Sequence, residues 1–358
     1  MPFSAASYLS GAIVRLIGTA AGCAFADETE RRFLRGILPA MNRKSKVRAA
    51  FAKRGAHIPP FLIASVASEC NLRCAGCYDR AGKHHAARQG SDMTDAQWDS
   101  VFSQADAAGV SFILLAGGEP LTRPGVLQAA AAYTRTVFPV FTNGTLLTGG
   151  ALDFFAAHRN LIPIFSIEGE AGGTDLRRGA GVAAAVDAAM SAMKARRAFY
   201  GACVTVTAEN AREVLSKDFV GRLKAGGCGI LLYVDYVPAE KGTEHLAPKE
   251  DDRRQNAARI DRLRETFGGL VLISFPGDER HMGGCLAAGR GFFHINSAGG
   301  AEPCPFSPYS DSSLKTGTLL EMLDSPFFRR LREDGVLKGE HTGGCVLFER
   351  ESAVRALV

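Results

Sequence analysis

Continuous apolar runs alternate with helical stretches between residues 61 and 240 of the chain. The runs lie at 61–66, 111–116, 137–141, 162–167, 200–206 and 230–234. Their spacing of about 25 to 50 residues leaves room for one crossover helix between each pair. Strands that are apolar along their whole length are typical of a parallel sheet covered by helices. Six βα units in succession predict an α/β fold, a partial TIM-like (βα)6 barrel.

Polar positions mark where helices and turns begin. Residues 94–97, Thr-Asp-Ala-Gln, form a capping box that predicts the start of a helix. The Ala-rich segment that ends at Met193 predicts a second helix. Near the end of the chain, the alternation at 292–296 and the pair Gly299-Gly300 predict a β-hairpin. A helix is expected to follow from about Leu319 to Arg332.

These patterns divide the chain of 358 residues into three parts. Residues 1–60 are expected to form a helical extension, 61–272 the partial barrel, and 273–358 a small α+β extension. The length fits one large domain with appendages.

The first 54 residues leave two interpretations open. An apolar run from Ala12 to Ala26 is similar to a secretory signal, but no positive residue precedes Arg15. Nine basic and no acidic residues follow between Arg31 and Arg54, which suits helices lying on an anionic membrane surface. The alternative is a helical extension that packs its apolar face on the main domain and solvates its basic face. Pro39 breaks any long amphipathic period and favours this alternative.

Composition excludes several classes of protein. Apolar residues make up 46% and charged residues 22%, which excludes a disordered chain or a disulfide mini-scaffold. The net charge of +5 is too small for this length to indicate nucleic-acid binding, so no nucleic-acid partner is expected. No stretch of 18 uncharged apolar residues occurs, so a membrane-spanning helix is not expected.

The cysteines change this picture. They stand at positions 23, 70, 74, 77, 203, 228, 285, 304 and 345. Their number is odd, and three of them fall within eight residues, where disulfide pairing is awkward. The pattern indicates metal ligands in a reducing cytoplasm. Cys203 and Cys228 lie in apolar surroundings and are expected to be buried.

Small, polar and cysteine residues follow the expected strands. The segment after the first strand is Cys70-Asn71-Leu72-Arg73-Cys74-Ala75-Gly76-Cys77-Tyr78. The next strand ends carry Gly117-Gly118-Glu119-Pro120, Thr142-Asn143-Gly144-Thr145, Ser166-Ile167-Glu168-Gly169 and Thr205-Val206-Thr207. In barrels of this kind the reactive groups gather at the carboxyl ends of the strands. These segments are therefore expected to meet in one site.

The spacing Cys-x3-Cys-x2-Cys supplies three thiolates from one loop. A zinc site normally takes four ligands that arrive as pairs, and the chain has no second CxxC pair. A 4Fe–4S cluster normally takes four cysteines. Three cysteines would leave one iron open to bind another group.

On these residues the chain resembles the radical S-adenosylmethionine (SAM) superfamily, over about residues 61 to 240. The resemblance implies that Cys70, Cys74 and Cys77 hold a 4Fe–4S cluster whose open iron chelates the amino and carboxylate groups of SAM. It also implies an enzyme. A flavodoxin- or ferredoxin-type reductant is expected to reduce the cluster, which cleaves SAM to a 5′-deoxyadenosyl radical that abstracts hydrogen from a substrate.

The resemblance implies further SAM contacts. They are Gly117, Gly118 and Glu119 for the methionyl amine, and Asn143 and Ser166 near the ribose and carboxylate, with Glu168 as a weaker candidate. Glycines permit close approach of the backbone, and a carboxylate accepts from an ammonium group. The segment from Asp175 to Gly179 matches one that offers an arginine to the SAM carboxylate. Many members carry an aromatic residue just before the third cysteine. This chain has Gly76 there, and Tyr78 is the expected substitute in the adenine contact.

The carboxyl-terminal segment resembles the SPASM and twitch extensions of this superfamily, which bind auxiliary Fe–S clusters. The resemblance rests on Cys285, Gly299 and Cys304. We expect one auxiliary cluster with Cys285, Cys304 and Cys345 as ligands, and a fourth ligand from a non-cysteine side chain, substrate or water. The alternative is three structural thiols.

The amino-acid sequence does not identify the substrate. Auxiliary clusters favour a peptide or protein substrate, whereas the basic amino-terminal segment suits a lipid-linked or other small molecule. A SAM-binding electron-transfer or sensor protein without turnover is a further alternative. Tyr233, Asp235 and Tyr236, at the sixth strand end, are candidates for substrate contact.

Overall fold

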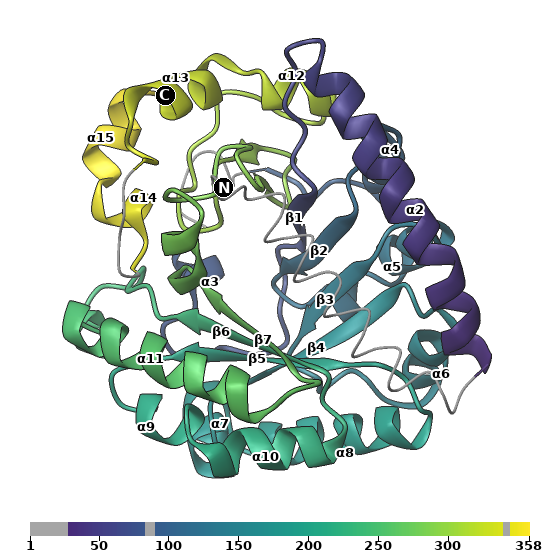
Figure 1. The fold of residues 1–358 in the computed structure, drawn as a ribbon, viewed down its shortest axis with the longest axis vertical. Coiled ribbons are helices and arrows are strands. Elements are labelled where there is room, and N and C mark those ends of the chain that lie inside the picture. Colours follow the sequence, from purple (N-terminus) through teal and green to yellow (C-terminus); the bar gives the residue numbers. More distant parts are fainter. Residues whose placement is uncertain (1–27, 83–89, 339–343) are drawn as a thin grey trace.

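The structure is a computed structural model, and it describes residues 28–82, 90–338 and 344–358 (Figure 1). The signal-like run from Ala12 to Ala26 and Cys23 lie outside the described residues.

Nine strands form one sheet in the order β7-β6-β5-β4-β3-β2-β1-β8-β9. They are β1 (Phe61–Ala67), β2 (Phe112–Gly117), β3 (Phe138–Thr142), β4 (Leu161–Ile167), β5 (Gly201–Val206), β6 (Ile230–Asp235), β7 (Val271–Phe275), β8 (His294–Ile295) and β9 (Ala301–Glu302). All neighbours pair in parallel except β8 and β9, which are antiparallel. The six predicted strands are confirmed to within one residue at each end. The partial barrel is also confirmed, because the sheet curves without closing.

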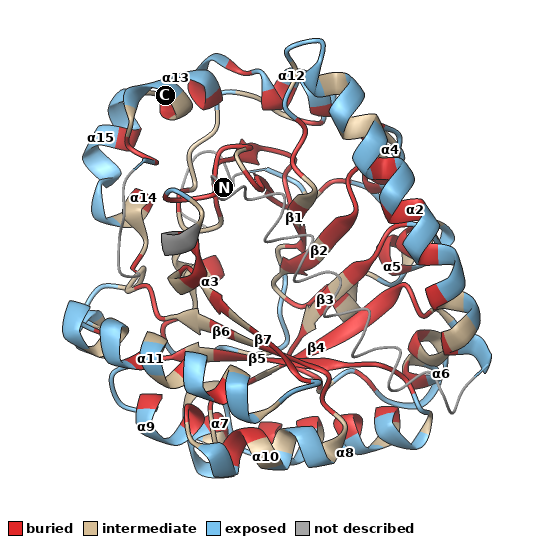
Figure 2. Ribbon diagram, viewed as in Figure 1, coloured by how far each residue is buried: buried red, intermediate tan, exposed pale blue. Residues whose placement is uncertain are grey.

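Helices connect the strands and cover the outer face of the sheet (Figure 1). They are α3 (Tyr78–Gly82), α4 (Asp95–Ala108), α5 (Pro124–Ala132), α6 (Gly149–Ala157), α7 (Ala171–Arg178), α8 (Val182–Ala195), α9 (Ala211–Val214), α10 (Lys217–Gly226) and α11 (Glu250–Thr266), with short 3-10 turns η2 (Pro120–Thr122), η3 (Glu244–Leu246) and η4 (Gly277–His281). Figure 2 shows the strands largely buried and the outer helix faces exposed. The predicted capping box opens α4, where Thr94 Oγ1 accepts from Gln97 N and Gln97 Oε1 accepts from Thr94 N.

Helix α2 (Glu28–Ala52) covers the amino-terminal end of the barrel interior. Its residues Leu34, Ile37 and Met41 form one apolar cluster with inward-facing residues of β2 and β4 to β7. Lys44 is buried, and its Nζ donates to Val110 O at 2.7 Å in the turn before β2. The helix thus packs its apolar face on the main domain.

Pro39 does not interrupt this helix, contrary to the prediction. Proline removes one backbone donor from a helix and normally kinks or ends it. Here Ile37 and Ala40, both 1% exposed, anchor the chain on either side of Pro39 against the barrel. Tertiary packing therefore overrides the local signal.

The outward face of α2 is basic. Its exposed cations, together with those just after its end, are Arg32, Arg35, Arg43, Lys46, Lys53 and Arg54. None of the helices within the described ranges is long and apolar enough to cross a bilayer.

The carboxyl-terminal extension continues the same sheet. The predicted hairpin is present as β8 and β9, and β8 pairs with β1. Where one helix was predicted from Leu319 to Arg332, the structure has two, α12 (Leu319–Leu323) and α13 (Pro326–Asp334). Pro326 has no N–H to continue α12 and instead begins α13. Helices α14 (Val346–Glu349) and α15 (Glu351–Ala356) follow.

The domain division at residues 272 and 273 stays a prediction. The structure places this point inside β7, which pairs with β6 over five positions. The extension therefore begins in the middle of a strand of the common sheet.

Candidate functional site

The cysteine loop, Cys70–Cys77, follows β1 at the carboxyl end of the sheet. Cys70 is exposed, whereas Cys74 and Cys77 are half-buried. Burial raises the pKa of Cys70 and Cys74, and the neighbouring thiols of the loop raise it further. Leu72 N donates to Cys70 Sγ at 3.4 Å, a contact that would stabilise the sulfur as a thiolate. The three thiols therefore share one partly open site.

The Gly-Gly-Glu segment at the end of β2 lies directly against this loop. Gly118 N donates to Ala67 O at 2.7 Å, and Glu119 N donates to Glu69 O at 2.8 Å. A Cβ atom at Gly118 would come within 1.9 Å of Glu69 O. Only glycine lets the two backbones meet here, so the motif holds the cysteine loop on the sheet.

Glu119 is buried, and its carboxylate binds the end of β3. Its oxygens accept from Leu121 N at 3.1 Å, Thr142 Oγ1 at 2.8 Å and Asn143 N at 2.8 Å. Burial raises the pKa of Glu119, and these donors oppose the rise. Because a carboxylate has about four acceptor positions, one remains for a ligand. A contact of Glu119 with the SAM amine stays a prediction.

Asn143 connects β3 with the cysteine loop. Its Nδ2 donates to Asn71 Oδ1 at 2.8 Å and lies 3.9 Å from Cys70 Sγ. Its Oδ1 accepts from Thr145 N and Oγ1. Ser166 is half-buried on β4, opposite Cys203 of β5. The structure brings Asn143 to the loop, and the ribose contacts of both residues stay predictions.

Glu168 holds two arginines at the end of β4. Its Oε1 lies 2.7 Å from Arg177 Nη1 and 2.5 Å from Arg178 Nη2. Within the described part of the chain, its buried Oε2 has no hydrogen-bond partner. Arg177 also binds the cysteine loop, because its Nε donates to Ala75 O at 3.1 Å. Both arginines of the predicted segment thus stand beside the loop.

Tyr236, just after β6, fills the space beside Gly76. A Cβ atom at Gly76 would lie 2.1 Å from Tyr236 Oη. The guanidinium of Arg177 lies 5.6 Å from the ring centroid, which places the tyrosine between α7 and the cysteine loop. Tyr236 thus occupies the neighbourhood where an aromatic residue at position 76 would stand.

Tyr233 does not face the expected substrate side, whereas the adenine contact of Tyr78 stays a prediction. The ring of Tyr78 contacts Phe306 of the extension edge-on, with ring centroids 5.1 Å apart. Tyr78 begins α3, which turns its side chain toward the extension. Tyr233 is 1% exposed and donates to Val214 O at 2.7 Å, so it packs against α9 on the outer face of the sheet. Asp235, by contrast, is half-buried at the end of β6.

A second group of thiols gathers in the extension. Burial raises the pKa of Cys304 most, and the neighbouring Cys345 and then Cys285 raise it further, so the three cysteines lie near one another. Burial is the main cause of the raised pKa of both Cys285 and Cys304. The structure thus brings together the three predicted ligands of an auxiliary cluster. We call Cys285, Cys304 and Cys345 the carboxyl-terminal thiols.

Within the described residues, neither thiol group is arranged to hold a single metal ion. In the described ranges, no three His, Cys, Asp or Glu side chains approach closely enough to hold one metal ion. A 4Fe–4S cluster spreads its cysteines around a larger body. Cys203 and Cys228 are buried, as predicted; Cys203 lies near Glu168 and Arg178, whereas Cys228 Sγ donates to Ile230 O.

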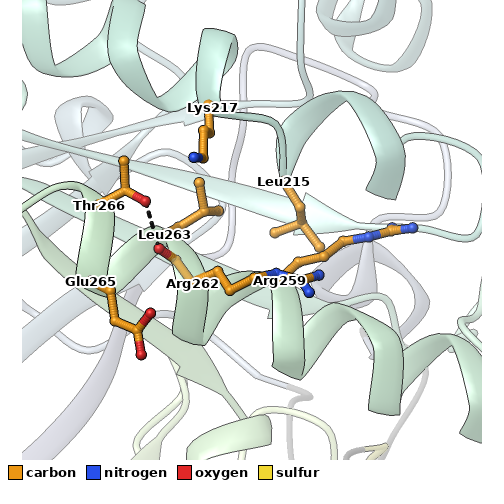
Figure 3. Close-up of a pocket in the computed structure, with 7 residues that line it drawn as sticks. All are labelled: Leu215, Lys217, Arg259, Arg262, Leu263, Glu265 and Thr266. Atoms are coloured by element: carbon orange, nitrogen blue, oxygen red, sulfur yellow. Dashed lines mark hydrogen bonds between the residues drawn. The ribbon is translucent and has the colours of Figure 1, made fainter.

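A surface pocket lies on the outer side of the barrel, away from both thiol groups. Figure 3 shows its lining, which comes from the ends of α9 and α10 and from α11: Leu215, Lys217, Arg259, Arg262, Leu263, Glu265 and Thr266. Its one hydrogen bond among these residues runs from Thr266 Oγ1 to Arg262 O. It carries none of the predicted site residues.

Sequence reasoning missed Glu240 as a contact of the loop. Glu240 Oε2 accepts from Gly76 N at 2.8 Å across 164 positions of sequence. No local motif marks such a distant partner. The unusual glycine before Cys77 was the only available signal, because it leaves space that another segment must fill.

Comparisons with known proteins agree with the site. The family of 4Fe-4S single cluster domains matches residues 61–162, which contain the cysteine loop and the Gly-Gly-Glu segment. An AdoMet-dependent heme synthase of Methanosarcina barkeri is 25% identical over 310 residues, which cover 78% of this chain and 87% of that protein. A PqqA peptide cyclase of Ruegeria pomeroyi is 32% identical over 101 residues, or 28% of this chain and 26% of that protein.

Solved structures share the fold. Streptococcus suis SuiB bound to its precursor peptide SuiA has a TM-score of 0.64 at 18% identity, covering 84% of this chain and 75% of that chain. The anSMEcpe structure with bound AdoMet has a TM-score of 0.58 at 19% identity, covering 74% of this chain and 80% of that chain. Together with the three-cysteine loop, these likenesses make the chain similar to radical SAM enzymes with a SPASM-type extension.

Proposed function

We propose that Cys70, Cys74 and Cys77 hold a 4Fe–4S cluster with an open iron, and that SAM binds there. The observation that carries this proposal is the partly open group of three thiols at the end of β1, fixed against the Gly-Gly-Glu segment. When bound, the cluster supplies the electron that cleaves SAM. A low-potential flavodoxin or ferredoxin is the proposed reductant.

The surrounding residues orient the ligand. Gly117 and Gly118 let the backbone approach closely, and Glu119 is held rigid by three donors. The unpaired Oε2 of Glu168 and the two arginines bound to its other oxygen offer complementary charges to a zwitterionic amino acid group. The site therefore suits the methionyl end of SAM.

The proposal is tested by SAM cleavage after anaerobic reconstitution. We expect the wild-type protein with dithionite to produce 5′-deoxyadenosine, and Cys74→Ala to produce none. Cys228→Ala is the matched control, because this buried cysteine lies outside both thiol groups. Iron uptake and SAM binding without 5′-deoxyadenosine would favour a sensor or electron-transfer protein instead.

We infer that the carboxyl-terminal thiols hold one auxiliary Fe–S cluster. Their support is mutual proximity together with the burial of Cys285 and Cys304, while Cys345 is half-buried. Cys345→Ala tests the assignment. Unchanged iron content in that variant would remove Cys345 from the ligand set.

The proposed substrate is a peptide or protein. Its support is the likeness to the peptide cyclase over 101 residues and to the SuiB structure with a bound precursor peptide. A deuterated cell extract tests this class, because hydrogen abstraction carries deuterium into 5′-deoxyadenosine. We expect that deuterium transfer is lost after the extract has been treated with protease.

A small-molecule substrate is the second candidate. It is favoured by the likeness to the heme synthase, which spans more of this chain than the likeness to the cyclase. Deuterium transfer that survives protease and follows the low-mass fraction of the extract would support this candidate. It would contradict a peptide substrate.

Peripheral membrane contact is a separate proposal for the basic face of α2. Removing residues 1–54 would also uncover the apolar cluster around Ile37, so charge substitutions are the cleaner test. We expect that changing Arg32, Arg35, Arg43 and Lys46 to Gln reduces flotation with anionic liposomes and leaves the fold intact. Equal flotation of the wild type and the charge variant would mean that the basic face of α2 contacts only solvent.

A further inference from the structure

The segment after β6 packs against one side of the cysteine loop. We call residues 236–241 the β6 strap. Tyr236 N donates to Val206 O at 2.9 Å, which anchors the start of the strap on β5. From there the strap contacts the loop at a single residue, Gly76, through Tyr236 and Glu240.

Gly76 is the position where the loop accommodates the strap. It has a φ of +64°, which disfavours other residues, and Tyr236 stands where its side chain would be. Tyr236 is 4% exposed, so its ring is enclosed between the loop and α7. This packing fixes the position of the chain that carries Glu240.

The side chain of Glu240 accepts a hydrogen bond from the backbone N–H of Gly76. Its Oε2 accepts from Gly76 N at 2.8 Å, directly before Cys77. Backbone N–H groups in a cluster loop otherwise serve as donors to sulfur. In this loop one donor is directed to a carboxylate instead.

The negative charge of Glu240 is only weakly compensated. Arg80 Nη2 lies 3.5 Å from the carboxylate, and both side chains are about 40% exposed (42% and 41%). Exposed pairs at this distance contribute little. The Glu240 carboxylate therefore keeps much of its negative charge. It binds Gly76, the residue directly before the proposed cluster ligand Cys77.

We propose that Glu240 lowers the reduction potential of the cluster held by Cys70, Cys74 and Cys77, and so acts as a positioning residue. This inference rests on the proposed function. Net charge and hydrogen bonds to sulfur set the potentials of Fe–S clusters. A nearby negative charge disfavours the added electron, and the loss of an N–H donor to sulfur acts in the same direction.

The test is a redox titration of the reconstituted holoenzyme, followed by electron paramagnetic resonance, in wild type and Glu240→Gln. Glutamine keeps an acceptor for Gly76 N and removes the charge. We expect a midpoint potential shifted upward, with the iron content unchanged. Glu244→Gln is the matched control, because Glu244 accepts from Gly242 N on the far part of the same connection.

A second variant, expected to shift the midpoint potential in the opposite direction, separates an effect of charge from an indirect effect. Arg80→Gln removes the weakly interacting cation beside Glu240, and we expect a downward shift of its midpoint potential that is smaller than the upward shift of Glu240→Gln. Equal potentials for wild type, Glu240→Gln and Glu244→Gln would overturn the inference while leaving the cluster assignment standing. A wild-type protein that takes up no cluster would overturn the proposed function as well.

Discussion

The cysteine loop and the carboxyl-terminal thiols carry the same chemistry in different surroundings. Cys70 is exposed and its two companions are half-buried. In the extension, Cys285 and Cys304 are 6% and 2% exposed. Burial is the first cause of the raised pKa in both groups, but it raises the pKa of Cys304 and Cys285 well above the ordinary value. One group contains an exposed thiol, whereas the other has two buried thiols beside the half-buried Cys345.

This difference matches two distinct tasks. A cluster that binds SAM needs an iron that solvent and ligand can reach. A cluster that only passes electrons or holds the fold is better enclosed, because burial protects it from exchange. The contact of Tyr78 with Phe306 joins the two regions directly, since these residues follow Cys77 and Cys304 by one and two positions.

The largest expected effect comes from breaking the support of the cysteine loop. In Gly118→Ala, the new Cβ would meet Glu69 O, and backbone cannot move aside as a side chain can. We expect a loss of about 3 kcal/mol in unfolding free energy and loss of the iron bound by the loop. Denaturant titration and iron analysis measure both.

Gly172→Ala is the control for that variant. Apart from its own helix backbone and chain neighbours, no described atom lies within 4 Å of a Cβ at this position in α7. The variant should be at least as stable as wild type, because alanine favours a helix more than glycine does, and it should keep its iron. If Gly118→Ala behaved the same way, the close approach of the two backbones would not matter to the site.

The group of carboxyl-terminal thiols is tested by Cys304→Ala. We expect the iron content to fall from about eight to about four per chain, because one 4Fe–4S cluster is lost. SAM binding at the cysteine loop should persist. Cys228→Ala, which alters a similarly buried cysteine outside the group, should keep all the iron. Full iron content in both variants would make the carboxyl-terminal thiols structural.

Asp235 links the two regions and gives stability a pH dependence. Burial raises its pKa to about 6, against the opposing effects of the Arg253 charge and the Gly344 amide. The native protein therefore binds this proton more tightly than the unfolded chain does. Stability is lost as the pH rises from about 4 to about 6, because the carboxylate becomes charged at a partly desolvated position.

Asp235→Asn removes this penalty. We expect the variant to be more stable than wild type by on the order of 2 kcal/mol at pH 8, and the difference to vanish below about pH 4. Denaturant titrations across this range measure it. Asp251→Asn, at a position whose side chain is 82% exposed, should show no such trend. A constant difference between wild type and Asp235→Asn at all pH values would contradict this explanation.

The smallest expected effect is a difference in chemical reactivity between the thiols of the two groups. In metal-free protein at pH 8, iodoacetamide should alkylate Cys70 at least about tenfold faster than Cys285 or Cys304. Cys228 provides an internal reference for a buried structural thiol, because burial raises its pKa to about 12. Peptide mass spectrometry gives the rate at each cysteine. Similar rates for all four thiols would show that the two groups do not differ in access.

Local patterns predicted the parts of the fold that depend on local rules. The six strands follow apolar runs, and α4 begins at the capping box that ends in Gln97. The path of α2 through Pro39 was not predictable, because it depends on packing against residues more than seventy positions away. The contacts of Gly76 with Tyr236 and Glu240 were hidden for the same reason.

In the candidate site, too, the features that follow general rules were predictable, and those that depend on distant contacts were not. The residues of motifs at the strand ends met as expected, because parallel strands bring their carboxyl ends to one edge. Tyr78 was assigned by closeness in sequence to Gly76, but the turn into α3 carries its ring to Phe306. Sequence distance is a poor guide to which side chain fills a space, whereas strand order is a good one.

Iron and sulfide analysis after anaerobic reconstitution tests the central claim most directly. It compares wild type with a variant in which Cys70, Cys74 and Cys77 are all alanine, and with the matching variant of the carboxyl-terminal thiols. We expect about eight irons in wild type and about four in each variant. Wild-type protein without iron, or a cysteine-loop variant with the full wild-type content, would contradict the account.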